Sequence, residues 1–371
     1  MISRSVDKAT AGAAERFFRA SKRLSAVGSL GLLALSCLFC GNARAQASLA
    51  TTCQQVTVPV ALTDGGPRAY SVFGNLCLPA SGQANSVILT VHGGTYDHRY
   101  WDWPYIPQLY SFRNFMTSAG YAVFVYDRIG DGLSSHPVSS DITLSSNGYV
   151  AHELVQALRQ GRINGYAFKH VVLAGHSVGS YTSWMEAGQY RDVDAVILTG
   201  ITHKISSAAS AAALQDFYPA QQDPAFQNSG LDAGYLTTRP GTRAAVFYYP
   251  ATTDPTVVQL DEKSKQTMSA TESTDISATG PGSAVSYSAL INVPILVVNG
   301  QNDFLFCGDG GTDCSSSASL QSAERPYYSA SPSVTAVVVP ASGHDINLEV
   351  TAPLWYGASL QWLLSTARIA P

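Results

Sequence analysis

Charge is scarce in this chain: acidic and basic residues make up 13% of its 371 residues, and the formal net charge is −4. A balance this close to neutral gives no reason to expect a nucleic acid as a partner. The sequence also lacks a G-x-x-x-x-G-K-[ST] loop, a dinucleotide-binding glycine fingerprint and an H-E-x-x-H pair. It therefore offers no motif for a nucleotide cofactor or a zinc ion, and we expect no cofactor. The 31 glycines and 19 tyrosines fit a globular secreted protein better than a disordered or coiled-coil one.

The N-terminal segment has the three parts of a targeting signal. A basic region precedes the apolar run "AVGSLGLLALSCLFCG", and "NARAQA" then offers A-x-A cleavage at Ala45 or Ala47. We predict a signal peptide over residues 1–45, a secreted or periplasmic mature protein, and no stable membrane insertion after cleavage. A retained signal anchor is the alternative, because the basic region is long. A lipid anchor on Cys37 or Cys40 is disfavoured, because bulky residues stand where such a site requires small ones.

Four cysteines remain after the predicted cleavage, and an even number in an exported chain indicates disulfides. Three pairings are open in principle. We favour Cys53–Cys77 and Cys307–Cys314, because each pair is close in sequence. The stretch "CGDGGTDC" between the last two carries Asp309 and Asp313, but it lacks the twelve-residue loop and closing glutamate of a calcium site. No metal is predicted.

Short apolar runs alternate with helical patterns along most of the chain. After a hairpin pattern over residues 56–78, apolar runs that predict strands include "SVILTVHGG", "YAVFVYDRIG", "HVVLAG", "DAVILTG", "VPILVVNG" and "SVTAVVVPASG". Helical patterns separate several of them, among them one helix expected over residues 105–120. This alternation predicts an α/β fold with a doubly wound, mostly parallel sheet. Ligands bind such sheets at the carboxyl ends of the strands.

One segment interrupts this rhythm. Residues 201–290 show no regular alternation and are rich in proline and aromatic residues. A structureless loop of this length is uncommon in a compact domain, so we expect a mostly helical lid inserted between two parts of the core, 46–200 and 291–371. A separate second domain is the alternative.

The segment "LAGHSVGS" carries the strongest chemical signal. Gly175 and Gly179 flank Ser177 at equal distance, a strand pattern precedes them and a helical pattern follows. This strand–turn–helix context is that of the G-x-S-x-G nucleophile elbow, in which small neighbours permit a strained turn that presents the serine hydroxyl. We predict that Ser177 is a nucleophile.

A serine hydroxyl needs a base, usually a histidine oriented by a carboxylate. Asp303 follows the run "VVNGQN", and His344 follows "VVVPASG", so both fall beyond the carboxyl ends of predicted strands. We predict His344 as base and Asp303 as its partner. Asp309, Asp313 and Asp345 are alternative carboxylates.

The segment "TVHGGTYD" follows the first core strand, and its glycines would let backbone N–H groups approach a bound carbonyl oxygen. We predict an oxyanion hole formed by Gly94 or Thr95 together with Val178. The aromatic stretch after it is expected to form a substrate-binding wall, with ordinary packing as the alternative. Its aromatic residues are Tyr96, Tyr100, Trp101 and Trp103.

In this order, "VHGGT", "YDRIGDGLS", "GHSVG", "GQND" and "GHDI" resemble the α/β-hydrolase superfamily over nearly all of the mature chain. The resemblance implies Ser177 as nucleophile, His344 as base and Asp303 as acid, with Asp127 and Arg128 structural. The chain departs from esterases that carry three glycines after the histidine, because Thr95 stands at the third position.

These expectations favour an exported serine esterase or lactonase that cleaves a small-molecule carboxylic ester through an acyl-enzyme. A hydrolase-fold protein that binds without turnover is the alternative from another class. An acyltransferase or lyase on the same scaffold is also consistent with the motifs. Epoxide hydrolases and haloalkane dehalogenases are disfavoured, because they place an aspartate where Ser177 stands.

Overall fold

The computed structural model describes residues 51–278 and 280–371, all within one compact unit, Leu49–Pro371. The predicted signal peptide and its cleavage site lie outside the described residues. Within the described ranges, no helix combines the length and the apolar character needed to cross a membrane.

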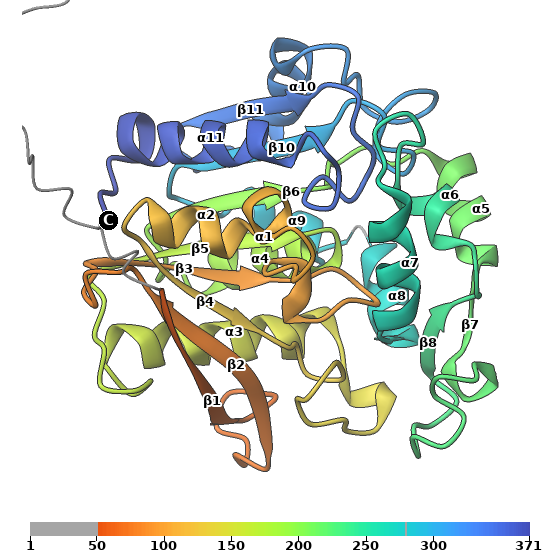
Figure 1. The fold of residues 1–371 in the computed structure, drawn as a ribbon, viewed down its shortest axis with the longest axis horizontal. Coiled ribbons are helices and arrows are strands. Elements are labelled where there is room, and N and C mark those ends of the chain that lie inside the picture. Colours follow the sequence, from red (N-terminus) through yellow and green to blue (C-terminus); the bar gives the residue numbers. More distant parts are fainter. Residues whose placement is uncertain (1–50, 279) are drawn as a thin grey trace, which may run out of the picture. The chain divides into compact units, whose positions relative to one another are not determined.

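Eight strands form the central sheet, in the order β1-β2-β4-β3-β5-β6-β10-β11 (Figure 1). β1 and β2 form an antiparallel hairpin and β2 pairs antiparallel with β4, whereas all later neighbours are parallel. This confirms the predicted doubly wound, mostly parallel sheet. The strands are β1 (Thr52–Val60), β2 (Tyr70–Leu78), β3 (Ser86–Val91), β4 (Ala122–Tyr126), β5 (His170–His176), β6 (Ala195–Thr199), β10 (Ile295–Gly300) and β11 (Val334–Val339).

The winding direction of the sheet reverses between β3 and β5. From β3 the chain continues to β4 on one side, and from β5 it continues to β6 on the other. The loops that leave the carboxyl ends of these two strands therefore diverge and open a crevice, which is where open α/β sheets bind ligands. The segments that begin at His92 and at Ser177 border this crevice.

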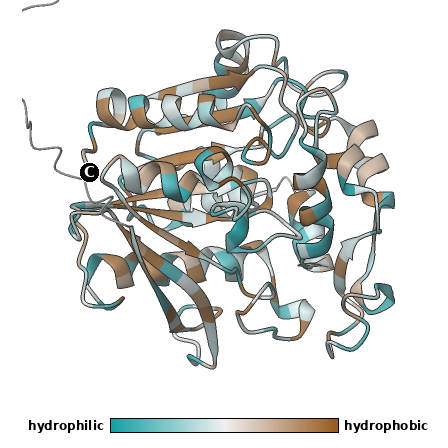
Figure 2. Cartoon of the chain, viewed as in Figure 1, coloured by the Kyte–Doolittle hydropathy of each residue, from teal (hydrophilic) through white to brown (hydrophobic). Residues whose placement is uncertain are grey.

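Helices cover both faces of the sheet, and alternate strand residues enter two separate cores. Residues of α3 (Leu144–Arg159), α4 (Val178–Gln189) and α10 (Ser317–Glu324) share one core with Val87 and Leu89. Residues of α2 (Phe112–Ser118) and α11 (Ala352–Trp362) share the other with Ile88. The central strands are correspondingly apolar along most of their length (Figure 2). Two-sided burial explains why the sequence shows continuous apolar runs.

The single helix expected over residues 105–120 is two helices, α1 (Pro107–Tyr110) and α2. Ser111 separates them in an extended conformation, with φ −106° and ψ 102°. Its hydroxyl accepts a hydrogen bond of 2.9 Å from the backbone N–H of Asn114 and so caps α2. Serine is a strong N-cap residue, and here capping outweighs the continuous amphipathic pattern.

The insertion (residues 201–290) lies between β6 and β10 in sequence. Its described residues form the expected helices and, in addition, a small antiparallel sheet that was not expected. Strands of two to four residues are too short to show an alternating pattern in the sequence. The elements are α5 (Ser207–Gln215), β7 (Phe217–Pro219), β8 (Tyr235–Thr238), α6 (Arg243–Phe247), α7 (Pro255–Ser264), β9 (Met268–Ser269), α8 (Ala270–Ile276) and α9 (Ala284–Ser288).

Candidate active site

Ser177 occupies a sharp turn between β5 and α4. Its backbone adopts φ 51° and ψ −118°, a strained conformation that costs a non-glycine residue roughly 1–3 kcal/mol. A Cβ on Gly175 would approach the Gly179 carbonyl oxygen to 2.5 Å, and one on Gly179 would overlap the Val91 carbonyl. Both flanking positions therefore require glycine, which explains the G-x-S-x-G spacing in physical terms.

His344 and Asp303 form a buried pair at the carboxyl ends of β11 and β10. The Nδ1 atom of His344 lies 2.9 Å from Oδ2 of Asp303. The other oxygen of Asp303 accepts hydrogen bonds from the backbone N–H groups of Leu305 (3.0 Å) and Phe306 (3.3 Å). The carboxylate is thereby fixed in orientation, and the imidazole is held through it.

Two opposing effects act on the pKa of His344. Burial acts to lower it, but the charge of Asp303 and the hydrogen bond to that carboxylate outweigh burial, so the pKa is raised above its usual value. The Nε2 atom is buried and has no hydrogen-bond partner in the described part of the chain. An imidazole held at Nδ1 and free at Nε2 is arranged to accept a proton at Nε2.

Gly200, directly after β6, provides space for the rings of His176 and His344. The ring centroids of His176 and His344 lie 4.8 Å apart. A Cβ on Gly200 would lie 2.7 Å from Cε1 of His176 and 3.0 Å from Cε1 of His344. Sequence analysis missed this residue; the glycine that closes the run "DAVILTG" was the available signal.

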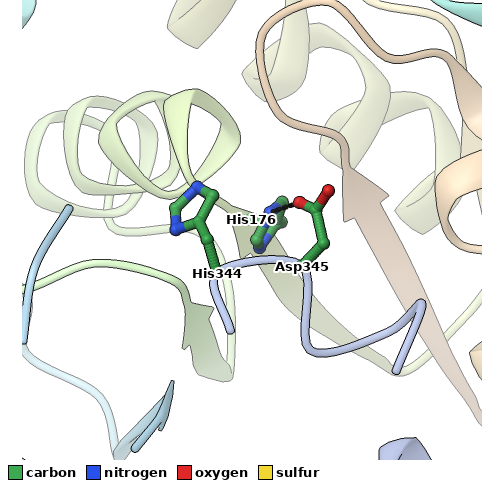
Figure 3. A group of neighbouring side chains, drawn as sticks. All are labelled: His176, His344 and Asp345. Atoms are coloured by element: carbon green, nitrogen blue, oxygen red, sulfur yellow. Dashed lines mark hydrogen bonds and ion pairs between the residues drawn. The ribbon is translucent and has the colours of Figure 1, made fainter. Parts of the chain in front are cut away.

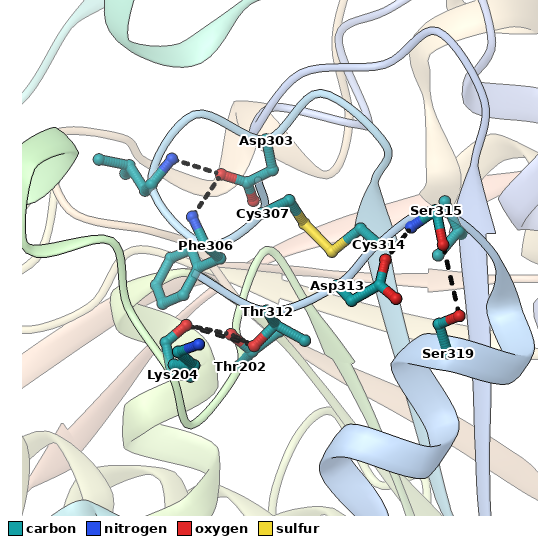
Figure 4. The surroundings of a disulfide bond; sticks show 12 residues. Thr202, Lys204, Asp303, Phe306, Cys307, Thr312, Asp313, Cys314, Ser315 and Ser319 are labelled. Carbon is teal, nitrogen blue, oxygen red and sulfur yellow. Dashed lines mark hydrogen bonds between the residues drawn. A yellow bond between two sulfur atoms is a disulfide. The ribbon is translucent and has the colours of Figure 1, made fainter. Parts of the chain in front are cut away.

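The loop after Asp303 is closed by the Cys307–Cys314 disulfide (Figure 4). The backbone N–H of Cys307 donates to the carbonyl of Asp303 at 2.9 Å, and Thr312 bonds to Thr202 at 2.8 Å. The bridge thus lies within the loop that orients the carboxylate. The second predicted pair, Cys53–Cys77, joins facing residues of β1 and β2, so the structure contains both predicted disulfides.

The loop after β3 lies against the turn at Ser177, because a Cβ on Gly93 would come to 3.3 Å from the Ser177 Cβ. Gly94 lines the same cavity as Ser177 and Val178, and no hydrogen bond from the N–H of Gly94 or of Val178 to a described residue is formed. The N–H of Thr95 instead donates to the carbonyl of Thr267 at 3.0 Å. The sequence offered Gly94 or Thr95 as the oxyanion donor from this loop. Because the N–H of Thr95 is bound to Thr267, Gly94 is the remaining candidate.

His92 fixes the peptide that carries this donor. Its Nε2 atom accepts a hydrogen bond of 2.9 Å from the backbone N–H of Arg128, so Nδ1 carries the proton and donates to the Gly93 carbonyl at 2.8 Å. Burial is the largest cause that lowers the pKa of His92, to about 3, which keeps the ring neutral. Because the C=O and N–H of a trans peptide point in opposite directions, holding the Gly93 carbonyl directs the N–H of Gly94 the other way.

The aromatic residues expected to line the substrate pocket pack elsewhere. Tyr96, Tyr100, Trp101 and Trp103 are all buried in the core shared with α2 and α11, and none of them lines the cavity at Ser177. Tyr100, for example, stacks on His176 with ring centroids 4.3 Å apart. The loop turns back over the sheet, so its apolar rings fill the core, as in the alternative of ordinary packing.

A cavity of about 170 Å³ opens at Ser177. Its walls come from the core and from the insertion, and no acidic or basic side chain lines it. The insertion, expected from the sequence to be rich in aromatic residues, contributes Phe217 and Phe247, whereas the walls from α4, β9 and the Asp303 loop were not expected. The lining residues are Gly94, Ser177, Val178, Tyr181, Ile205, Ser210, Ala213, Leu214, Phe217, Val246, Phe247, Met268, Ser273, Ile276, Ser277, Leu305 and Phe306.

Asp345 lies beside this site but is not the carboxylate that holds His344. Its Oδ1 atom lies 3.1 Å from Nε2 of His176 (Figure 3). One potential ligand atom from each of His176, His344 and Asp345 lies within 4.8 Å of the others. However, Nδ1 of His344 is engaged by Asp303 and Nδ1 of His176 contacts Thr199 at 3.0 Å. These contacts favour a hydrogen-bonded cluster over a metal centre.

The fold and the position of Ser177 at the switch point of the sheet define an α/β hydrolase. A family model described as "Alpha/beta hydrolase family" matches residues 88–354, and the chain belongs to that family. A sequence search of curated proteins finds no match.

Solved structures with the same fold include two esterases and another hydrolase. A thermophilic esterase from Thermogutta terrifontis, solved with malate bound, is 19% identical, with a TM-score of 0.56 over 84% of this chain and 98% of that one. An E-2-(acetamidomethylene)succinate hydrolase is 18% identical, with a TM-score of 0.54 over 84% and 99%. An esterase from Pyrococcus furiosus is 14% identical, with a TM-score of 0.54 over 87% and 93%. At such identities the likeness shows the fold alone.

Proposed function

We propose that this chain is an exported serine esterase that cleaves neutral, largely apolar carboxylic esters or lactones through an acyl-enzyme. The observation that carries the proposal is the setting of Ser177: it stands on a strained turn at an apolar cavity, and the residue before it, His176, lies 4.8 Å (ring centroids) from His344, which pairs with Asp303. Membership of the α/β hydrolase family and the esterase neighbours support the same reaction class.

In the first half of the proposed reaction, Ser177 Oγ forms a bond to the carbonyl carbon while Nε2 of His344 takes the hydroxyl proton. The N–H groups of Gly94 and Val178 donate to the oxyanion. Loss of one such donor usually lowers the rate by about 10² to 10³. The bond to the leaving alkoxide then breaks, and His344 returns the proton to that oxygen.

In the second half, water attacks the acyl carbon and gives its proton to His344. The bond to Ser177 Oγ breaks, the acid leaves, and the proton returns to the serine. Asp303 holds the imidazole in the required tautomer and stabilises its charged form throughout.

The cavity supports a neutral, apolar substrate. It contains no arginine or lysine that could pair with a carboxylate or phosphate of the substrate. Because the insertion supplies several walls, we propose that it acts as a lid over the bound ester. The two disulfides support function in an oxidising compartment outside the cytosol.

Labelling with an organophosphonate fluoride, followed by peptide mass analysis, tests the proposal. The label is expected on Ser177, together with hydrolysis of a graded series of neutral aryl esters. Negligible turnover of all neutral esters and lactones, alongside rapid turnover of an anionic or peptide substrate, would overturn the substrate class. Absence of label on Ser177 would overturn the mechanism.

A further inference from the structure

A buried arginine of the insertion begins a continuous chain of polar contacts that ends beside the nucleophile. Arg243 binds Asp261 of α7 through two hydrogen bonds, of 2.7 and 2.8 Å. A third guanidinium nitrogen donates to Oγ1 of Thr95 at 2.8 Å, and the guanidinium lies 4.3 Å from the ring centroid of Tyr96. Arg243 and Asp261 are both fully buried.

Tyr96 continues this chain from the insertion to Asp345. Its hydroxyl lies 3.1 Å from Oδ2 of Asp261 and contacts Oδ2 of Asp345 more closely. A phenol has one proton to donate, and Asp261 already accepts from Arg243 and from Tyr248 at 2.8 Å. Tyr96 therefore donates its proton to Oδ2 of Asp345, whose Oδ1 atom lies at hydrogen-bonding distance from His176 Nε2.

The charge of Asp345 bears directly on the catalytic histidine. Burial is the largest cause that raises the pKa of this carboxyl, to about 6, against the opposing effects of His344, Arg243 and the Tyr96 hydrogen bond. The ionised carboxylate in turn helps to raise the pKa of His344. The titratable and charged groups that face Asp345 are His176, His344, Asp303, Tyr96, Tyr100, Tyr248, Arg243 and Asp261.

We propose that Asp345 is a positioning residue for the reaction. Its carboxylate holds His176, which directly precedes the nucleophile, and keeps a second negative charge near His344, while Tyr96 ties it to the Arg243–Asp261 pair of the insertion. This inference rests on the proposed function. It adds to that function a carboxylate that forms no hydrogen bond to Ser177 or to the ring of His344, although its charge influences that ring.

A purely structural role accounts poorly for this arrangement. Burying charged pairs is costly, and apolar residues of similar volume often give equal or greater stability. The chain nevertheless keeps three charged side chains fully buried along one path, namely those of Arg243, Asp261 and Asp345.

The test is the pH profile of kcat/KM for a neutral aryl ester in Asp345→Asn, with phosphonate labelling of Ser177 measured in parallel. An asparagine oxygen can still accept from His176, but the charge is lost. The pKa of His344 should then fall, so the acidic limb of the profile should move to lower pH. We expect kcat to fall by on the order of 10 to 10², with KM little changed.

Two further variants keep this test decisive. Asp309→Asn removes an exposed carboxylate from the loop after Asp303 and should leave the profile in place. Tyr96→Phe removes the hydrogen bond that favours ionised Asp345, and should move the acidic limb in the same direction by a smaller amount, even if Asp345→Asn does not fold. An unmoved limb in the folded variants, with Ser177 still labelled, overturns the role of Asp345 alone. Failure to label Ser177 in the unaltered protein overturns the proposed function as well.

Discussion

Two Ser–His–carboxylate sets can be compared among the described residues. The set with the shorter hydrogen bonds, around His203, lacks the strained turn and the cavity that mark the set around His344. In the second set, His203 bonds to Glu324 at 2.7 Å and to Ser288 at 2.8 Å. At the candidate active site, His344 is held by Asp303, while its Nε2 atom has no partner among the described residues. Hydrogen-bond lengths alone would select Ser288 rather than Ser177, the serine of the proposed function.

Three differences separate the two sets. Ser288 is 1% exposed and ends a short helix, whereas Ser177 sits on a strained turn at a cavity. The hydroxyl of Ser288 also lies 2.8 Å from the Val285 carbonyl, which competes with His203 for its proton. The ring of His203 is also enclosed, with Tyr327 stacked at 4.1 Å. Access and backbone strain therefore distinguish Ser177, the candidate nucleophile, from Ser288.

Exchanging each serine for alanine should give the largest contrast. Ser177→Ala should lower kcat by on the order of 10⁴ to 10⁶ and remove phosphonate labelling, because the nucleophile is lost. Ser288→Ala should leave kcat in place and lower the free energy of unfolding by about 1–3 kcal/mol, because His203 loses a buried partner. Ester hydrolysis and denaturant titration measure the two effects. Comparable losses of kcat in both variants would erase the distinction.

The two carboxylates offer the next comparison. Asp303→Asn should lower kcat by about 10⁴, because the amide favours the wrong imidazole tautomer, and its circular dichroism spectrum should stay unchanged. Glu324→Gln should preserve kcat and lower the melting temperature. The partner of His344 has been misassigned if Asp345→Asn lowers kcat by about 10⁴ while Asp303→Asn lowers it only slightly.

The oxyanion loop has no counterpart at Ser288, so its disruption should affect only the first set. In His92→Ala the Gly93 carbonyl loses its donor, and the orientation of the Gly94 N–H, the proposed oxyanion donor, is no longer fixed. We expect kcat to fall by about 10² to 10³. A fall in kcat with KM unchanged, measured on one neutral ester, would show loss of transition-state stabilisation. A rise in KM alone would contradict this role.

The smallest expected effect is on pH dependence. The base must be neutral to accept a proton, so kcat/KM should rise with pH through the pKa of His344. Because that pKa is raised, the midpoint of the acidic limb should lie above the usual value of about 6.5. His203→Gln should leave this midpoint in place. A midpoint below the usual value would contradict the electrostatic influence of Asp303 and Asp345.

The sheet and the three central residues of the candidate site could be predicted from sequence because their signals are local. Two-sided burial makes each parallel strand a continuous apolar run, and the elbow at Ser177 needs glycines at fixed positions. The Asp303–His344 pair was expected from strand ends and from the family resemblance, since parallel strands deliver their following residues to one edge, but strand ends left Asp309, Asp313 and Asp345 as alternatives. Its hydrogen bond is present as expected.

Other parts of the site could not be predicted because distant segments determine them. The direction of Tyr96 depends on Arg243 and Asp261, which lie far along the chain. The N–H of Thr95 is taken by Thr267, a partner that no local pattern reveals. The aromatic loop after β3 has a composition equally suited to a pocket wall and to a core, and packing against α2 and α11 decides the outcome.

The contacts of Thr95 also bear on whether the insertion can be exchanged between members of this family. Its N–H donates to Thr267 and its carbonyl accepts from Gln266 at 2.9 Å, while Arg243 binds its hydroxyl. All three partners belong to the insertion, which would be the natural segment to exchange when a chimaera with new selectivity is built. In this chain such an exchange would also rebuild the support of the loop that carries Gly94. Under the proposed function, selectivity and turnover would be inherited together, and a transplanted insertion would need compensating changes around Thr95.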